Sequence, residues 1–287
     1  LSLNMEKKAI YAVVLAALIA GSNGILIKAM PSLTTGAIGW FRAGVPVLFL
    51  LPVLLRTNQL RVKGNTKMLL FASVINAVRT YFFLMAFVYT SVGNAIVLFY
   101  VYPLFITIIE TTVYKAPISK KQILYMLLAF AGIAFTYADK EFSFESRDFI
   151  GMLAAILAAV GYAFFVSIFK RQTQDCNRNQ LLFYQNLAGA VLFIPFLFGL
   201  KDVELTHMGI GIFYGLLIGI VQFGLFFFGL KHLNATTAAS LMYLEVLSAV
   251  ILSFFILKEQ LSWNTYIGGA LILISSFFIS RLNRKTS

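Results

Sequence analysis

The sequence has few charged residues, and acidic residues are the scarcer sign. Charged residues make up 12% of the 287, with 11 Asp and Glu against 23 Lys and Arg, and the formal net charge is +12. About a quarter of a soluble domain is charged, because its surface must face water. Here hydrophobic residues make up 60%, and the mean hydropathy is +0.87. This balance excludes an ordinary soluble globular domain and favours a chain embedded in a lipid bilayer.

Cysteine and histidine are almost absent. The single cysteine, Cys176, excludes an internal disulfide framework, and we interpret it as inert. His207 and His232 lack the His-Glu-x-x-His pattern of a zinc protease, and every aspartate falls in a loop between apolar segments. We therefore expect no catalytic residue, no metal site and no cofactor. An intramembrane enzyme and a non-transporting receptor remain as distant alternatives.

Apolar segments of about twenty residues recur along the whole chain, and each is long enough to cross a hydrocarbon core of about 30 Å. We predict that they are helices, since a segment in lipid must satisfy its backbone hydrogen bonds internally. Ten spans are predicted, at 8–29, 36–55, 67–90, 93–114, 119–138, 148–169, 179–199, 208–231, 236–257 and 262–281. The sequence therefore predicts an all-α polytopic membrane protein.

The placement of Lys and Arg between the spans predicts the orientation. Cytoplasmic loops of membrane proteins carry an excess of these residues. The Lys- and Arg-rich segments are 7–8, 56–67, 115–121, 170–178, 231 and 281–285, whereas the alternate loops hold only Lys28, Lys140, Arg147, Lys201 and Lys258. Both termini are therefore predicted to be cytoplasmic. Because the basic residues form no continuous face, we expect no nucleic-acid partner.

The second half of the chain repeats the first at an offset of 143 residues. Without gaps, the stretch from Ala86 faces the stretch from Gly229, so that Tyr100 pairs with Tyr243. Pro52 and Pro195 also pair at this offset.

Loop charges give an independent sign of the repeat. A five-helix unit has an odd number of spans, so its second copy must enter the membrane from the opposite side, and equivalent loops should differ in charge. The loop at 56–67 has four Lys and Arg against one at 200–207, and the loop at 115–121 has three against one at 258–261. The sequence therefore predicts two inverted five-helix repeats (5+5).

We place the N-terminal repeat at 5–138 and the C-terminal repeat at 148–282, together forming one transport domain. Inverted repeats are the usual construction of secondary transporters, which bind substrate near the midplane at the repeat interface.

Short motifs in both halves resemble the EamA-type transporters of the drug/metabolite transporter (DMT) superfamily. The resemblance covers essentially the whole chain. It is carried by Gly-Ser-Asn at 21–23, Phe-Arg at 41–42, Tyr-Thr-Ser at 89–91 and the stretch LMYLEVLSAVILSFFILKEQLSWNTYIGGALIL from Leu241. It implies a ten-helix metabolite-transporter fold, with helices 1–4 and 6–9 around a central cavity and helices 5 and 10 peripheral. Ala20 stands where the family often has Trp, and Val246 where it often has Pro.

Two charged residues lie near the middle of predicted spans, where charge is costly and usually faces a cavity or a partner. The repeat pairs Arg79 with Gln222 and Glu245 with Tyr102, so each charge occurs in one repeat only. We expect Arg79 to bind a carboxylate or phosphate, and Glu245 to bind an ammonium group or carry a coupling proton. A structural salt bridge between Arg79 and Glu245 remains as the alternative.

Two other charged residues lie nearer span ends. For Arg42, packing or gating and ligand contact are both open. Glu110 is predicted to be structural and to pair with Lys115 or the loop that follows. The remaining candidate contacts for a ligand are polar or aromatic side chains: Asn23, Trp40, Asn76, Phe83, Tyr100, Gln222 and Tyr243.

These observations predict a secondary transporter that moves a small metabolite, an amino acid or a similar zwitterionic or aromatic solute, by alternating access through a central cavity. No Walker-type loop is present, so we expect a coupling proton, an exchanged solute or the substrate gradient to drive transport. Nucleobases, S-adenosylmethionine and organic cations or drugs remain as alternative substrates, and the direction is open. We expect a lipid-embedded monomer or weak homodimer in a bacterial inner membrane.

Overall fold

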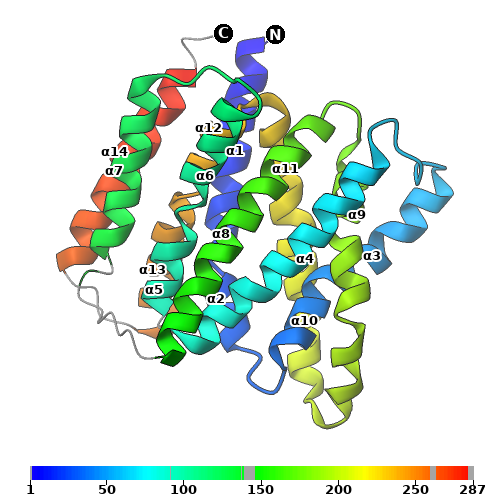
Figure 1. Ribbon diagram of the computed structural model, residues 1–287. Coiled ribbons are helices and arrows are strands. Elements are labelled where there is room, and N and C mark those ends of the chain that lie inside the picture. Colours follow the sequence, from blue (N-terminus) through cyan, green and yellow to red (C-terminus); the bar gives the residue numbers. More distant parts are fainter. Residues whose placement is uncertain (1, 91, 137, 139–145, 259–262, 284–287) are drawn as a thin grey trace.

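The computed structural model describes residues 2–90, 92–136, 138, 146–258 and 263–283, and every regular element in these ranges is helical (Figure 1). The α-helices are α1 (Ser2–Ala20), α2 (Asn23–Lys28), α3 (Thr35–Arg56), α4 (Thr66–Tyr89), α5 (Val92–Phe99), α6 (Tyr102–Thr112), α7 (Lys120–Thr136), α8 (Ser146–Gln172), α9 (Arg178–Leu192), α10 (Leu205–Leu216), α11 (Phe223–His232), α12 (Ala235–Leu241), α13 (Leu244–Leu257) and α14 (Trp263–Asn283). A 3-10 helix, η1, covers Ile194–Asp202, and a π-helix, η2, covers Leu217–Gln222. The turn at 259–262, part of the family-like stretch, lies outside the described residues.

Many of these helices join end to end into membrane-length segments. Eight such segments are long and apolar enough to cross a membrane: Asn4–Lys28, Thr35–Arg56, Thr66–Ala86, Asn94–Thr112, Arg147–Gln172, Leu205–His232, Ala235–Ile256 and Trp263–Leu282. A ninth is present if α9 and η1 count as one span bent by 61°. The all-α class and the membrane character are thereby confirmed. The remaining predicted span, at 119–138, corresponds to α7. Its 17 residues fall just short of the 18 that define a membrane-length helix here, so the count of ten spans stays a prediction.

Helix packing follows the two-repeat pattern. The most extensive pairs are α4 with α8, α7 with α14 and α3 with α9, followed by α4 with α9 and α1 with α11. At the 143-residue offset, the pair α4 and α8 corresponds to the pair α11 and α1. The pairs α7–α14 and α3–α9 each map onto themselves. Such an arrangement is that of two units related by an internal twofold axis.

Both chain termini lie at one end of the bundle, called the terminal end below (Figure 1). Hydrogen bonds tie the connections at this end together: Gln180 Nε2 donates to the carbonyl groups of Gln59 and Arg61 at 2.8 and 2.9 Å. Lys170 Nζ donates to the carbonyl groups of Leu230 and Leu233, each at 2.6 Å. The Lys- and Arg-rich loops thus gather at the end that carries the termini.

Two equivalent spans change their helical geometry near the middle. The break between α5 and α6 falls at residues 100–101, and the break between α12 and α13 at residues 242–243. In the first, Pro103 occupies the start of α6 and has no N–H to donate. In the second no proline is present, and the turn tightens through hydrogen bonds from Met242 N to the Ala239 carbonyl and from Tyr243 N to the Ser240 carbonyl, both 3.2 Å. The repeat therefore preserves the break without preserving the residue that causes it.

The glycines of α10 and η2 allow an unusually close helix contact. A Cβ at Gly215 would lie 2.3 Å from the Phe41 carbonyl oxygen, and a Cβ at Gly219 would lie 2.8 Å from the Arg42 carbonyl oxygen. These glycines therefore let the α10–η2 segment pack directly against the backbone of α3, as small residues do in membrane bundles. The contact fixes α3 at the level of Arg42.

Candidate functional site

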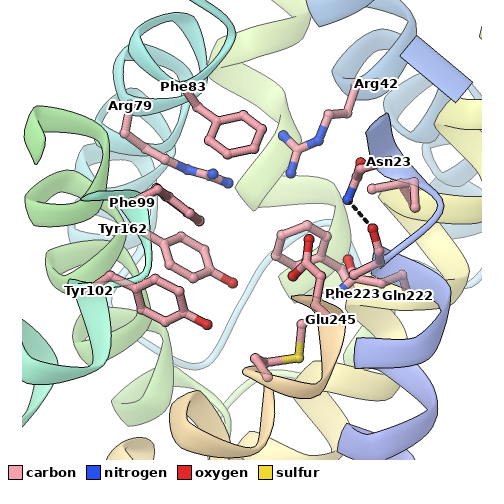
Figure 2. A pocket seen from close by; sticks show the side chains of 13 residues that line it. Asn23, Arg42, Arg79, Phe83, Phe99, Tyr102, Tyr162, Gln222, Phe223 and Glu245 are labelled. Atoms are coloured by element: carbon pink, nitrogen blue, oxygen red, sulfur yellow. Dashed lines mark hydrogen bonds between the residues drawn. The ribbon is translucent and has the colours of Figure 1, made fainter. Parts of the chain in front are cut away.

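A cavity of about 40 Å³ lies between the two repeats, at the level of the helix breaks. Figure 2 shows its lining side chains, which come from α1–α6, α8, η2, α11 and the α12–α13 segment. The lining residues are Ala20, Asn23, Arg42, Arg79, Phe83, Phe99, Tyr102, Tyr162, Ile218, Gln222, Phe223, Met242 and Glu245.

Six of the ten candidates from the sequence line this cavity: Asn23, Arg42, Arg79, Phe83, Gln222 and Glu245. Asn76 and Tyr100 lie one layer behind, in contact with Arg79 and Glu245 respectively. Tyr243 is fully buried with its ring 6.0 Å from that of Tyr100, and Trp40 packs edge-on against Phe41 outside the cavity. The structure therefore gathers most of the predicted set at one place, and ligand binding by these residues stays a prediction.

Arg79 is held in a fixed orientation by its own helix. Its Nε and Nη2 both donate to Asn76 Oδ1, at 2.9 and 2.7 Å. Asn76 Nδ2 in turn donates to the main-chain carbonyl of Gln185 on α9 at 2.9 Å. The guanidinium also lies 4.6 Å above the ring centroid of Tyr162 on α8, within cation–π range. Arg79 is only 4% exposed, so its charge is removed from water by protein on several sides.

The close approach of α8 depends on a glycine. A Cβ at Gly161 would lie 2.6 Å from Arg79 Cβ, which is closer than real Cβ contacts. Gly161 therefore lets α8 pack against α4 at this level and brings the neighbouring Tyr162 ring under the guanidinium.

Arg42 reaches the same turn of α4 from α3. Its Nη1 donates to Thr80 Oγ1 at 3.2 Å, and Thr80 Oγ1 donates to the Asn76 carbonyl at 2.6 Å. The Arg42 guanidinium also lies 5.3 Å from the ring centroid of Phe223. Figure 2 shows Arg42 and Arg79 pointing into the cavity from opposite sides. The side chains of Arg42 and Arg79 thus both hydrogen-bond to the same turn of α4.

Glu245 lines the same cavity and lies below the two guanidinium groups in the view of Figure 2. It is in the first turn of α13, directly after the helix break at 242–243. Tyr100 and Asn23 lie within hydrogen-bonding reach of its carboxyl group. The Asn23 side chain is itself fixed, because its Nδ2 donates to the Ala20 carbonyl and its Oδ1 accepts from Tyr214, both at 2.9 Å.

The structure does not support a direct salt bridge between Arg79 and Glu245. The hydrogen bonds of Arg79 to described residues go to Asn76, and no ion pair with Glu245 occurs in the described part of the chain. The alternative interpretation from the sequence, in which Arg79 and Glu245 form a structural salt bridge, therefore lacks that ion pair. The two side chains line one cavity instead.

Equivalent positions of the two repeats meet in this cavity. Arg79 and Gln222, Tyr102 and Glu245, and Phe99 and Met242 are three pairs at the 143-residue offset, and all six residues line it. The cavity is therefore pseudo-symmetric in position and asymmetric in chemistry.

Several lining residues were not named as candidates from the sequence. The offset gave a signal for Tyr102, the counterpart of Glu245, but not for Phe99 and Met242, which are counterparts of each other. Tyr162 gave no such signal: its counterpart is Ile19, and only the packing of α8 against α4 reveals it.

Glu110 has a structural role, but with a different partner from the one predicted. Its two carboxylate oxygens accept from Arg171 Nη1 and Nη2 at 2.6 and 2.9 Å, so the predicted pairing with Lys115 is wrong. The Arg171 guanidinium also lies 3.3 Å from the Tyr114 ring centroid. This bidentate pair joins α6 to α8 at the terminal end. Among the described residues, no three His, Cys, Asp or Glu side chains gather where a metal ion would bind.

Comparisons with known proteins agree with the two-repeat architecture. The model of the EamA-like transporter family matches residues 7–138 and again residues 149–281. No curated protein matches the chain. A crystal structure of another protein superposes with a TM-score of 0.81 over 98% of this chain and 99% of the other, at 15% sequence identity. At that identity the likeness shows the fold alone.

Proposed function

This chain belongs to the EamA-like transporter family, and we propose that it is a secondary transporter for a small zwitterionic or aromatic metabolite such as an amino acid. The observation that carries the proposal is the cavity between the repeats, where Arg42 and Arg79 point in from opposite sides and Glu245 lines the same space. A solute with a carboxylate and an ammonium group matches this separation of charge, because each group meets the opposite sign.

The walls between the charged groups suit an apolar or aromatic body. Phe83, Phe99, Tyr162 and Phe223 line the cavity with ring faces and edges. Such surfaces hold flat or branched apolar groups, while a few placed polar groups fix the orientation of the ligand.

We further propose ten spans with both termini in the cytoplasm, and alternating access between two arrangements of the repeats. The Lys and Arg of the loops at the terminal end support the orientation. The packing of α7 along α14 supports a spanning α7.

Closure at the terminal end supports alternating access. Four phenylalanines, Phe165 and Phe169 of α8 with Phe226 and Phe227 of α11, are at most 1% exposed and lie on the terminal side of the cavity residues Tyr162 and Phe223. Phe169 and Phe227 stack at 5.3 Å with an angle of 10° between their planes. For a solute to pass toward the terminal end, α8 and α11 must separate.

The test is transport by purified protein in liposomes. We expect uptake of radiolabelled amino acids that is lost in Arg79→Gln and in Glu245→Gln, with both variants monodisperse and helical by circular dichroism. Arg56→Gln removes an exposed charge at the end of α3 and is the matched control, which should transport normally. Full transport by both cavity variants contradicts the assignment of the site.

A further inference from the structure

We propose that Arg42 and Arg79 bind one anionic group of the solute together, so that an anion, and not an ammonium group, is what the cavity requires of its substrate. This inference rests on the proposed transport function and specifies the substrate class of the same site.

Both guanidinium groups are anchored and keep donors free. Arg79 uses Nε and Nη2 for Asn76, which leaves Nη1. Arg42 donates from Nη1 to Thr80 and also hydrogen-bonds the Tyr214 hydroxyl, which leaves further N–H groups of its guanidinium for a ligand. Both anchors belong to the Asn76–Thr80 turn of α4, and both groups point into the cavity (Figure 2). A planar, delocalised cation with free N–H groups is well suited to bind a carboxylate or phosphate.

The two arginines have no acidic partner in the described part of the chain. Their side-chain hydrogen-bond partners there are neutral: the Asn76 amide for Arg79, and the Thr80 and Tyr214 hydroxyl groups for Arg42. Two like charges facing one buried space repel, and a buried cation is costly unless an anion compensates it. Glu245 interacts with both arginines only through space, since its hydrogen-bond donors are Tyr100 and Asn23. An anion between the arginines would relieve this imbalance.

The charge balance ranks the possible solutes. With two arginines against one carboxyl group, the cavity carries an excess of positive charge. An anionic solute neutralises it, and a zwitterion leaves it unchanged while meeting both signs of charge. A solute with only an ammonium group would bring a third cation to the site. Binding therefore requires the anionic group of the solute. An ammonium group is tolerated because it can face Glu245, but it is not needed.

A set of probes on one skeleton separates these cases. L-Phenylalanine carries both groups, phenylpyruvate only the anion, and phenethylamine only the ammonium. Inorganic phosphate and acetate test whether an anionic group binds without an aromatic side chain. We expect phenylalanine and phenylpyruvate to raise the melting temperature of the purified protein and phenethylamine to leave it unchanged.

Substitutions assign the effect to the two arginines. In Arg42→Gln and in Arg79→Gln, the affinity for phenylpyruvate should fall by about tenfold or more, the change expected when one charged hydrogen-bonded contact is lost. Arg42→Lys keeps the charge but not the planar donors and should fall between wild type and Arg42→Gln. Arg42 is half-buried, so its variants test the proposal even if Arg79→Gln fails to fold. Arg56→Gln should bind as wild type does.

Three results overturn the proposal: stabilisation by phenethylamine equal to that by phenylpyruvate, anion binding that survives both glutamine substitutions, or no stabilisation by any anionic probe. Uptake into liposomes separates it from the transport function. Arginine-dependent binding without passage of any probe supports the anion site and contradicts transport, whereas uptake of phenethylamine but not phenylpyruvate supports transport and contradicts the anion site.

Discussion

The two repeats bring equivalent positions to the cavity and give them different chemistry. The first contributes Arg79 and Tyr102, and the second contributes Gln222 and Glu245 at the same places. What the repeats share, the helix breaks and the crossing of their helices, builds the scaffold. What they do not share, one cation and one carboxyl group, gives the cavity its polarity.

The difference extends to the support of these side chains. In the first repeat α4 runs without interruption through Arg79, and Asn76 holds the guanidinium. In the second, Gly219 stands at the position of Asn76 and packs against Pro46, and the backbone widens into the π-helix η2 that ends at Gln222. π-Helical turns are rare and often occur at functional sites. The first repeat thus fixes the Arg79 side chain by hydrogen bonds, whereas the second repeat sets the direction of the Gln222 side chain through the π-helix.

The largest effect on transport is expected when the residues at positions 79 and 222 are exchanged between the repeats. The double variant Arg79→Gln/Gln222→Arg keeps the composition of the cavity but moves the cation to the repeat with no Asn76. We expect transport to fall by about 100-fold or more, because an unheld guanidinium 1 Å or more from its place loses the oriented contact. Initial uptake rates in liposomes measure it. Transport at the wild-type rate would show that only the number of charges matters.

Asn76→Ala removes the support and leaves the arginine. We expect KM to rise by about tenfold with a smaller change in maximal rate, since a hydrogen bond to a charged group contributes about 1.5–3 kcal/mol. Asn76→Asp keeps the acceptor oxygen but places a negative charge beside Arg79 and loses the donor to the Gln185 carbonyl, so the affinity for an anionic solute should stay low. If Asn76 is only a packing residue, both variants will lower stability without this split between KM and rate.

Gly161→Ala tests the helix contact beneath Arg79. The added methyl group meets Arg79 Cβ at 2.6 Å, and overpacking of this kind costs about 1–3 kcal/mol. The expected outcome is a lower melting temperature together with weaker substrate binding. Gly24→Ala is the matched control, since a Cβ there meets nothing within 4 Å. Equal stability of the two variants would mean that α8 adjusts freely.

Gln222→Ala should have the smallest effect of the series. Gln222 is a neutral counterpart of Arg79 in a segment held by backbone packing, so we expect a change in uptake of about threefold or less, equivalent to less than about 1 kcal/mol. A loss as large as that of Arg79→Gln would place the substrate against the second repeat.

Much of the fold follows from the sequence, because apolar length and loop charge act locally. The span predicted at 36–55 is α3 at Thr35–Arg56, and the offset that aligned the halves also aligns the start of α9 at Arg178. The bend after α9 does not follow. Pro52 and Pro195 are equivalent, yet α3 continues through Pro52 and only the second repeat turns into a 3-10 helix.

Tertiary contacts distinguish these two prolines. Phe193 and Phe196, on either side of Pro195, pack against Gly39 and Gly36 of α3. No local pattern carries that information. The same reason explains why Tyr162 and the Arg171 partner of Glu110 were missed, since each depends on which helices meet.

The hydrogen bond from Asn76 to the Gln185 carbonyl crosses from one repeat to the other. Sliding α9 past α4 breaks it, releases Asn76 and loosens the grip on Arg79. An occupant bound to Arg79 therefore resists that slide, and its binding free energy is coupled to the relative position of the repeats. In thermodynamic terms, the proposed solute would be an effector of this relative motion of α9 and α4.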